Sequence, residues 1–250
     1  MITATDLAAK VAIVTGASSG LGARFARVLA AQGATVVAAG RRRARLDELA
    51  AEVPGIVPVT CDVTVPDDRA RLIEAALALG RLDVLVNNAG AGDPKPAVDE
   101  TWQGFEASLS VNLTATFSLC TLAAAPMLAA GSGSIVNIAS ILGQVASAPV
   151  TQAAYGAAKG GVISLTRHLA AEWAAGDVRV NAIAPGWFPS ELTEQMFATE
   201  SGLRWIERNT PMRRPGRPDE LDGVLLLLAS DAGSFITGQT IGVDGGWTAR

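Results

Sequence analysis

Residues 15–22 read Thr15-Gly16-Ala17-Ser18-Ser19-Gly20-Leu21-Gly22, and this glycine-rich stretch decides the fold of the 250-residue chain. It follows an apolar run typical of a buried strand, and a segment of helical period begins within it. A strand, a glycine-rich turn and a helix start form a cradle for a pyrophosphate, because backbone N–H groups and the positive end of the helix dipole meet its charge. The predicted contacts are Gly16, Ser18, Ser19, Gly20, Leu21 and Gly22, with Gly16 making the tight turn and Gly20 and Gly22 allowing close approach.

Outward from this stretch, short runs rich in Val and Ile alternate with longer segments of helical period. The predicted strands are Lys10–Thr15, Thr35–Ala39, Ile56–Thr60, Val84–Val86, Ser134–Ile138, Arg179–Ala182 and Thr240–Val243, and the predicted helices cover residues 20–32, 43–52, 67–79, 101–129, 153–175 and 218–230. This alternation predicts a parallel sheet with helices on both faces, and nearly continuous apolar strands are typical of burial on both sides. We therefore expect residues 1–250 to form a single α/β domain, a Rossmann-like doubly wound sheet of about seven strands.

Prolines mark two exceptions to the regular pattern. Pro126 falls late in the predicted helix 101–129 and is expected to kink or end it. Residues 185–217 hold several prolines and are expected to be irregular. A long irregular stretch in a compact domain is usually functional, so we expect residues 186–217, called here the substrate-loop segment, to determine the choice of substrate.

Composition excludes several classes of function. A formal net charge of −4 gives no basic surface for nucleic acid. One histidine, and Cys61 and Cys120 without ligand spacing, predict no metal site and two buried free thiols. The hydrophobic stretch Val224–Ala229 is too short to cross a bilayer, and the first residues show no cleavage-site pattern. We expect a cytoplasmic protein with neither a membrane nor a nucleic-acid partner.

The end of the second predicted strand indicates the identity of the cofactor. An acidic residue there would bind the ribose hydroxyls of NAD, but Gly40 is followed by Arg41, Arg42 and Arg43, with no carboxylate before Asp47. A guanidinium group pairs with a phosphate through two hydrogen bonds. The run predicts NADP(H), with Arg41 as the main clamp, and NAD(H) is the alternative. A different interpretation is that the three arginines decorate an exposed helix start.

The only tyrosine of the chain, Tyr155, stands four residues before Lys159. On a helix, residues at this spacing share a face with Cβ atoms about 6 Å apart. A phenol normally has a pKa of about 10, and a neighbouring ammonium group favours the phenolate. We therefore expect Lys159 to lower the pKa of Tyr155, so that the phenol exchanges protons with an alcohol or a ketone. The alternative is a half-buried ring beside a solvated amine.

Further motifs follow in order along the chain. They are Asp62-Val63 after the third predicted strand, Asn87-Asn88-Ala89-Gly90 after the fourth, Asn112 in the long helix, Ser140 after the fifth strand and Pro185-Gly186 at the end of the sixth. Together with the glycine-rich stretch, Tyr155 and Lys159, this ordered set resembles the classical short-chain dehydrogenase/reductase family over essentially the whole chain.

The resemblance implies a role for each matching residue. Tyr155 would be the general acid–base, and Lys159 would lower its pKa and hold the nicotinamide ribose. Ser140 would orient the substrate oxygen and stabilise its developing charge, and Asn112 would hold a water that extends the proton relay. The implied cofactor contacts outside the glycine-rich stretch are Arg41, Asp62, Val63, Asn88, Ala89, Gly90, Tyr155, Lys159, Pro185, Gly186, Phe188 and Ser190. Phe188 and Ser190 depart from the smaller aliphatic residue and the threonine that are usual there.

The function that the resemblance implies is NADP(H)-dependent interconversion of a secondary alcohol and a ketone by hydride transfer. The alternatives are an NAD(H)-dependent dehydrogenase of the same family and a catalytically idle NADPH-binding sensor or scaffold. Relatives imply a homotetramer, or else a homodimer. The substrate stays open among 3-oxoacyl thioesters, sugars or polyols, hydroxysteroids and other ketones.

Overall fold

The computed structural model describes residues 5–147 and 150–249, and its centre is one parallel sheet. The strands are β1 (Val11–Thr15), β2 (Thr35–Gly40), β3 (Ile56–Thr60), β4 (Val84–Asn87), β5 (Gly133–Ile138), β6 (Val178–Pro185) and β7 (Thr240–Val243). They lie in the order β3-β2-β1-β4-β5-β6-β7 with every neighbouring pair parallel. The predicted α/β class and doubly wound sheet are confirmed.

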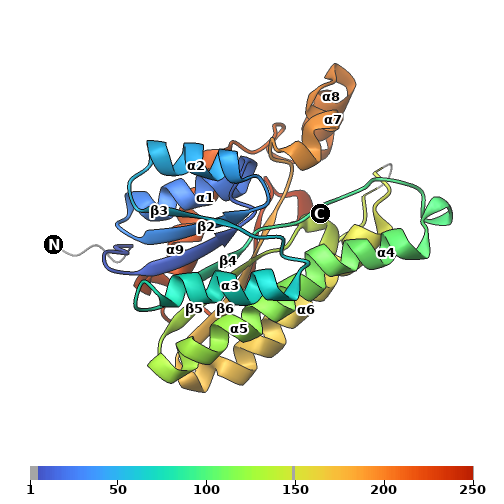
Figure 1. Cartoon of the computed structure of the whole chain (residues 1–250). Helices are drawn as coiled ribbons and strands as arrows, with labels where there is room; N and C mark the ends of the chain where they lie inside the picture. The colour runs from blue at the N-terminus through green and yellow to red at the C-terminus, as the bar shows by residue number, and fades with distance from the viewer. Residues whose placement is uncertain (1–4, 148–149, 250) are drawn as a thin grey trace.

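Helices cover both faces of this sheet (Figure 1). They are α1 (Gly20–Ala31), α2 (Arg43–Glu52), α3 (Pro66–Leu77), α4 (Trp102–Leu109), α5 (Ala115–Ala130), α6 (Ala153–Trp173), α7 (Glu194–Phe197), α8 (Glu200–Asn209) and α9 (Asp222–Ala229). Helices α1, α2 and α9 lie on one face, α3, α5 and α6 lie on the other, and α7 and α8 project beyond the end of the sheet.

Successive residues of β1 enter two different hydrophobic cores. Ala12 and Val14 pack in the core that contains Phe25 of α1 and the buried leucines of α2 and α9. Val11 and Ile13 pack in the core formed with α3, α5 and α6. Burial of a large apolar side chain stabilises a fold by about 1.5–3 kcal/mol. Both faces of the strand therefore have to be apolar, which explains the continuous apolar run in the sequence.

The order of the strands locates the functional crevice. From β1 the chain moves outward through β2 to β3 and then returns to the other side of β1 with β4. Ligands of such sheets bind at this switch point, beyond the carboxyl ends of the strands. The glycine-rich stretch follows β1 and Asn88 follows β4, so both motifs reach this crevice.

A π-helical turn, Ser110–Thr114, joins α4 to α5 and carries Asn112. The helix does not end at Pro126, so that alternative of the prediction is wrong. It continues to Ala130 and ends at Gly131, which adopts the left-handed conformation with φ 63°. Isolated π turns inside α-helices are frequent at functional sites.

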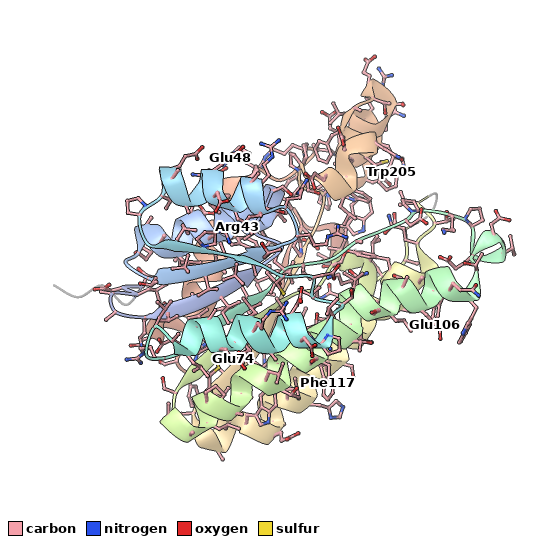
Figure 2. All side chains as sticks on the ribbon, in the orientation of Figure 1. Arg43, Glu48, Glu74, Glu106, Phe117 and Trp205 are labelled. Carbon is pink, nitrogen blue, oxygen red and sulfur yellow. The ribbon has the colours of Figure 1, made fainter. Side chains whose placement is uncertain are left out.

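The helical run Trp102–Ala130 is long and apolar enough, by length and composition, to cross a membrane. The expectation that rested on Val224–Ala229 overlooked this run. In the structure Leu119 and Met127 of α5 are buried in the core against the sheet, whereas α4 has no buried residue. Phe117, on the outer side of α5, is 48% exposed (Figure 2).

The substrate-loop segment is less irregular than its prolines predict, because α7 and α8 both lie within it. Helix α8 buries Ile206 against an aromatic cluster. The rings of Trp187 and Trp205 meet edge to face with centroids 5.4 Å apart, and Trp247 lies 5.9 Å from Trp187. Figure 2 shows Trp205 at the base of the projecting helices. These three tryptophans, called here the tryptophan cluster, anchor the segment to the body of the fold.

Candidate active site

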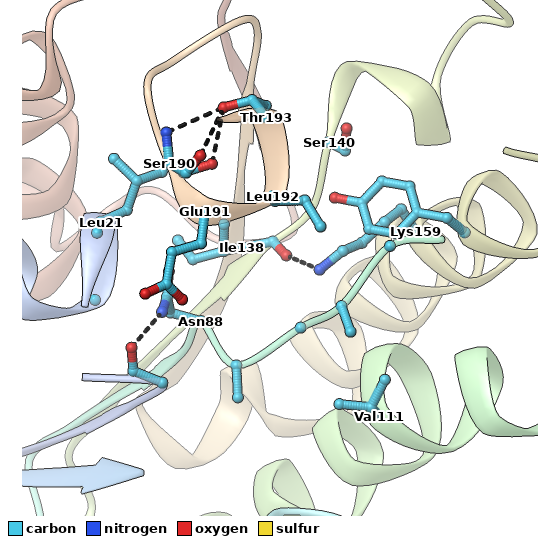
Figure 3. A pocket seen from close by; sticks show the side chains of 18 of the residues that line it. Leu21, Asn88, Val111, Ile138, Ser140, Lys159, Ser190, Glu191, Leu192 and Thr193 are labelled. Atoms are coloured by element: carbon cyan, nitrogen blue, oxygen red, sulfur yellow. Dashed lines mark hydrogen bonds between the residues drawn. The ribbon is translucent and has the colours of Figure 1, made fainter. Parts of the chain in front are cut away.

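A cleft of about 1040 Å³ opens at the carboxyl ends of the strands. The glycine-rich stretch lines one end of it, and Ser140, Tyr155 and Lys159 line the other. Figure 3 shows Leu21 and Asn88 on one side of this space and Ser140 and Lys159 on the other. Every residue that the sequence predicted to contact the cofactor borders this space. Asn112 does not line it and lies fully buried behind its wall. The chain therefore brings both predicted half-sites into one continuous cavity.

The glycine cradle depends on missing side chains. Gly16 has φ +67°, and a Cβ there would lie 2.8 Å from Nδ2 of Asn88, which donates to the Thr15 carbonyl at 2.9 Å. A Cβ on Gly22 would collide with the backbone carbonyl oxygen of Gly16. Ser19 precedes α1 without capping it through its side chain, which leaves first-turn N–H groups for an anion. The cradle is built as a phosphate site requires.

Arg42 reaches across this cradle. Its Nη1 donates to Oε1 of Glu191 at 2.8 Å, and its Nη2 donates to Oε2 at 3.1 Å and to Oγ of Ser19 at 2.6 Å. The hydrogen bond from Arg42 lowers the pKa of Glu191. Because Glu191 belongs to the substrate-loop segment, the ion pair joins that segment to the cradle. Arg41, the predicted clamp, lines the same cleft, and a run of three identical residues carries no signal that could separate Arg42 from it.

The other two arginines have different surroundings. Arg41 lines the cleft, and its charge adds to the hydrogen bonds from Thr64 that chiefly lower the pKa of Asp62. Arg43 is exposed on α2 and pairs with Asp47 at 2.8 Å. The interpretation of a decorated helix start therefore holds for Arg43, whereas Arg41 and Arg42 border the cleft beside the glycine-rich stretch.

The chain after β6 closes the cleft from the side of the substrate-loop segment. The ring of Phe188 is buried in the core and also lines the cleft. The hydroxyl of Ser190 lies 3.0 Å from that of Thr193, whose own hydroxyl donates to the Phe188 carbonyl at 2.6 Å. Pro185 and Gly186 line the cleft between these groups and the sheet. These contacts hold the segment in a defined turn at the cleft wall.

Tyr155 and Lys159 are both buried near the start of α6, with 8% and 4% of their surfaces exposed. Nζ of Lys159 lies 5.7 Å from the centroid of the phenol ring and donates to the Ile138 carbonyl at 2.7 Å (Figure 3). Burial lowers the pKa of Lys159 to about 8 and raises the pKa of Tyr155 to about 12, while a hydrogen bond with Ser140 acts in the opposite direction on the phenol. The expectation that Lys159 lowers the phenol pKa below its usual value is therefore wrong in this structure, because desolvation dominates.

Asn112 is fixed by the π-helical turn and by the loop after β4. Its Nδ2 donates to the carbonyls of Ala91 at 2.8 Å and Ser108 at 3.0 Å, and its Oδ1 accepts from the Ala91 N–H at 3.2 Å. A Cβ on Gly90 would lie 2.8 Å from this Oδ1 and 3.6 Å from Nζ of Lys159. Asn112 thus holds the loop beside Lys159, and its part in a proton relay stays a prediction.

The described residues offer no candidate metal site. Within residues 5–147 and 150–249, no group of three or more His, Cys, Asp or Glu side chains is arranged to hold a metal ion. Cys61 and Cys120 are buried free thiols, as predicted. Burial raises their pKa values to about 11 and about 12.

Comparison with known proteins agrees with this geometry. A family model described as enoyl-(acyl carrier protein) reductase matches residues 16–248. The chain belongs to the short-chain dehydrogenase/reductase family. It is 38% identical to the 3-oxoacyl-[acyl-carrier-protein] reductase of Thermotoga maritima over 96% of this chain and 98% of that protein.

Solved structures extend the likeness of this short-chain dehydrogenase/reductase to its whole length. A putative gluconate dehydrogenase from Agrobacterium tumefaciens superposes with a TM-score of 0.95 at 34% identity, covering 99% of each chain. A gluconate 5-dehydrogenase from Burkholderia cenocepacia, in complex with NADP and tartrate, superposes with a TM-score of 0.94 at 33% identity, covering 100% of this chain and 99% of that one. The family makes the chain an NAD(P)-dependent oxidoreductase acting on CH–OH or C=O groups.

The cleft wall of this short-chain dehydrogenase/reductase also contains residues that the sequence did not predict. Gln152 and Leu192 line the cleft near Tyr155, and Figure 3 places Leu192 between Glu191 and Lys159. The position of Gln152, three residues before Tyr155, was a usable signal. Leu192 follows Ser190 in a segment of unknown conformation, so its place could not be read from the sequence.

Proposed function

We propose that the protein is an NADP(H)-dependent oxidoreductase that interconverts a secondary alcohol and a ketone, with Tyr155 as the acid–base. The observation that carries this proposal is the single cleft that joins the glycine cradle and two arginines to a buried Ser140, Tyr155 and Lys159. We further propose that residues 1–250 act as one catalytic domain, with the substrate-loop segment over the substrate end.

The residues at the adenine end fit NADP(H). The cradle leaves room for backbone and phosphate where Gly16 and Gly22 lack a Cβ. Arg41 and Arg42 border the cleft, and no carboxylate replaces them at the end of β2, so a 2′-phosphate would meet positive charge. The NADP bound by the Burkholderia cenocepacia relative supports the same choice. The bound cofactor supplies or accepts the hydride.

Proton transfer is the work of the chain's own residues. With a pKa of about 12 the Tyr155 hydroxyl is protonated at neutral pH, so it can donate to a carbonyl oxygen that becomes an alkoxide. Ser140 would hydrogen-bond the same oxygen and stabilise its developing charge. The ammonium group of Lys159 would stabilise the phenolate that remains. In the oxidation direction the phenolate accepts the alcohol proton.

Two alternatives give different results. An NAD(H)-dependent dehydrogenase would bind NADH more tightly than NADPH, although two arginines at the cleft favour the phosphorylated cofactor. A catalytically idle NADPH-binding sensor would have no need of a buried phenol beside Ser140. A homotetramer or homodimer, a cytoplasmic location and the lack of nucleic-acid or membrane partners stay predictions of the same proposal.

The test is reduction of a panel of ketones, followed by cofactor absorbance with NADPH and NADH in parallel. We expect turnover with NADPH preferred, and Tyr155→Phe to lose about 10²–10⁴-fold in kcat while calorimetry shows NADPH binding kept. His168→Gln, an exposed change on the same helix, is the matched control and should leave turnover unchanged. Normal activity of Tyr155→Phe would overturn the mechanism, and a preference for NADH would overturn the cofactor assignment.

A further inference from the structure

The end of the cleft around Tyr155 has an apolar wall. The wall is formed by Ile141, Leu142, Val150, Trp187, Leu192 and Met196. Ser140 and Tyr155 provide hydroxyl groups for the reacting oxygen. A wall of this kind fits a hydrocarbon body of the substrate, because removing apolar surface from water is favourable.

Positive charge is scarce at this end. Among the described residues that line the cleft, the cations are Arg41, Arg42 and Lys159. The two arginines follow β2, separated from β5 by β1 and β4, and Lys159 already donates to the Ile138 carbonyl beside the phenol. Asp93 also lines the cleft, and the ammonium group of Lys95 is already paired with it at 2.6 Å and with Glu100 at 3.3 Å. A carboxylate or phosphate on the substrate would therefore lose its hydration without gaining a cation of its own.

One polar group of the wall lacks a partner. Oε1 of Gln152 is buried and accepts no hydrogen bond from the residues that the structure describes. A Cβ on Gly92 would lie 3.4 Å from this oxygen and 3.0 Å from Cδ1 of Leu192, so the amide is enclosed between the loop after β4 and the substrate-loop segment. An unsatisfied buried acceptor costs about 1–3 kcal/mol, and a ligand donor would relieve that cost.

A second unused group lies in the same lining. The indole Nε1 of Trp187 is buried and has no acceptor in the described part of the chain. Its ring is held edge to face by Trp205 and Trp247. Two residues of the lining therefore each carry an unpaired polar atom, an acceptor in Gln152 and a donor in Trp187. A hydroxyl group is a small neutral substituent that can satisfy either of them.

We propose that Gln152 is a specificity-determining residue and that the substrate is a neutral hydroxyketone, or the corresponding diol, whose second hydroxyl donates to Oε1 of Gln152. Its hydrocarbon body lies on the apolar wall. This inference rests on the proposed function, because it assigns the substrate class of the same site. A site that hydrogen-bonds a substrate hydroxyl discriminates against the analogue that lacks it, since its buried polar group is then left unpaired.

The test measures kcat/KM for a set of matched ketones on three proteins: the wild type, Gln152→Leu and Gln103→Leu. Gln103→Leu is the control, because it changes an exposed glutamine of α4 outside the cleft. The probes are cyclohexanone, its three hydroxyl-bearing isomers, and cyclohexanone carrying a carboxylate. For the wild type and the control we expect kcat/KM for the best hydroxyketone to exceed that for cyclohexanone by about tenfold. Gln152→Leu should abolish this preference, keep kcat/KM for cyclohexanone within about threefold and leave the carboxylate the poorest substrate.

The outcomes separate the two proposals. A wild type that prefers the plain or carboxylated ketone, or a Gln152→Leu variant that loses all substrates equally, would overturn the role of Gln152 while leaving the proposed function standing. A wild type that binds NADPH but reduces no ketone would overturn the proposed function, and this inference with it. If thermal unfolding shows that Gln152→Leu does not fold, Gln152→Met keeps the side-chain length and takes its place.

Discussion

Replacement of Lys159 by methionine should stabilise the fold while it destroys activity. The ammonium group is buried, and burial lowers its pKa to about 8 from 10.5. At pH 7 the side chain is charged in both the folded and the unfolded chain, so the folded state carries a cost of about 3 kcal/mol. The variant loses the hydrogen bond to the Ile138 carbonyl, worth about 1 kcal/mol. We expect a net gain of about 2 kcal/mol in the free energy of unfolding.

The effect must depend on pH in a defined direction. The folded pKa of Lys159 lies below the unfolded value, so between pH 8 and 10.5 the unfolded chain binds more protons. The wild type therefore regains stability as pH rises through that window. The cost of the buried charge falls from about 3 kcal/mol at pH 7 to about 1.5 kcal/mol at pH 9.5. The stability advantage of Lys159→Met over the wild type should therefore shrink by about 1.5 kcal/mol.

Urea unfolding followed by circular dichroism, without added cofactor, measures this difference at pH 7 and pH 9.5. The control is Lys95→Met, because Lys95 pairs with Asp93 at 2.6 Å and with Glu100 at 3.3 Å and should give no stabilisation. A Lys159→Met variant that is less stable than the wild type at pH 7, or whose advantage is the same at both pH values, would refute the reasoning.

Three further changes test other parts of the site. Glu191→Gln removes the carboxylate that holds Arg42 and leaves this guanidinium group to pair with the 2′-phosphate of NADPH. Calorimetry should therefore give a severalfold lower Kd for NADPH and an unchanged Kd for NADH, and an equal change in the two Kd values would contradict this role of Arg42. Gly22→Ala places a Cβ on the Gly16 carbonyl, so cofactor binding should weaken at least tenfold with the circular dichroism spectrum kept, and an unchanged Kd counts against the cradle. With a Tyr155 pKa of about 12, alcohol oxidation should accelerate between about pH 6 and pH 7.5, because it needs the phenolate and Lys159 stays protonated below its pKa of about 8. A flat or falling profile in that range argues for another base.

Much of the fold could be predicted because its strands are buried on both faces. Such burial demands continuous apolar runs, and β1, buried along its whole length, lies within the predicted strand Lys10–Thr15. The edge strands β3 and β7 are only partly buried, yet their predicted bounds also agree with the structure residue for residue. The π-helical turn at Ser110–Thr114 was not predicted, since no glycine or proline marks it. Helix α8 was missed because prolines surround it, although Ile206 faces the core as an amphipathic helix requires.

The site was predicted in position but not in its electrostatics. Sequence spacing put Tyr155 and Lys159 on one helix face, and both line the cleft. Spacing carries no information on depth, however, and the burial of both groups decides their pKa values. The direction in which Arg42 extends depends on Glu191, which is 149 residues away in the sequence, so no local pattern could reveal the pair.

The tryptophan cluster gives the protein a built-in optical reporter. Trp205 lies on α8 within the substrate-loop segment, whereas Trp247 lies outside that segment, and their rings, 5.4 Å apart, are close enough for excitation energy to pass between them. Any displacement of the substrate-loop segment would change that coupling and hence the ultraviolet emission. A displacement of the substrate-loop segment on ligand binding could therefore be timed in stopped-flow experiments on the unlabelled chain.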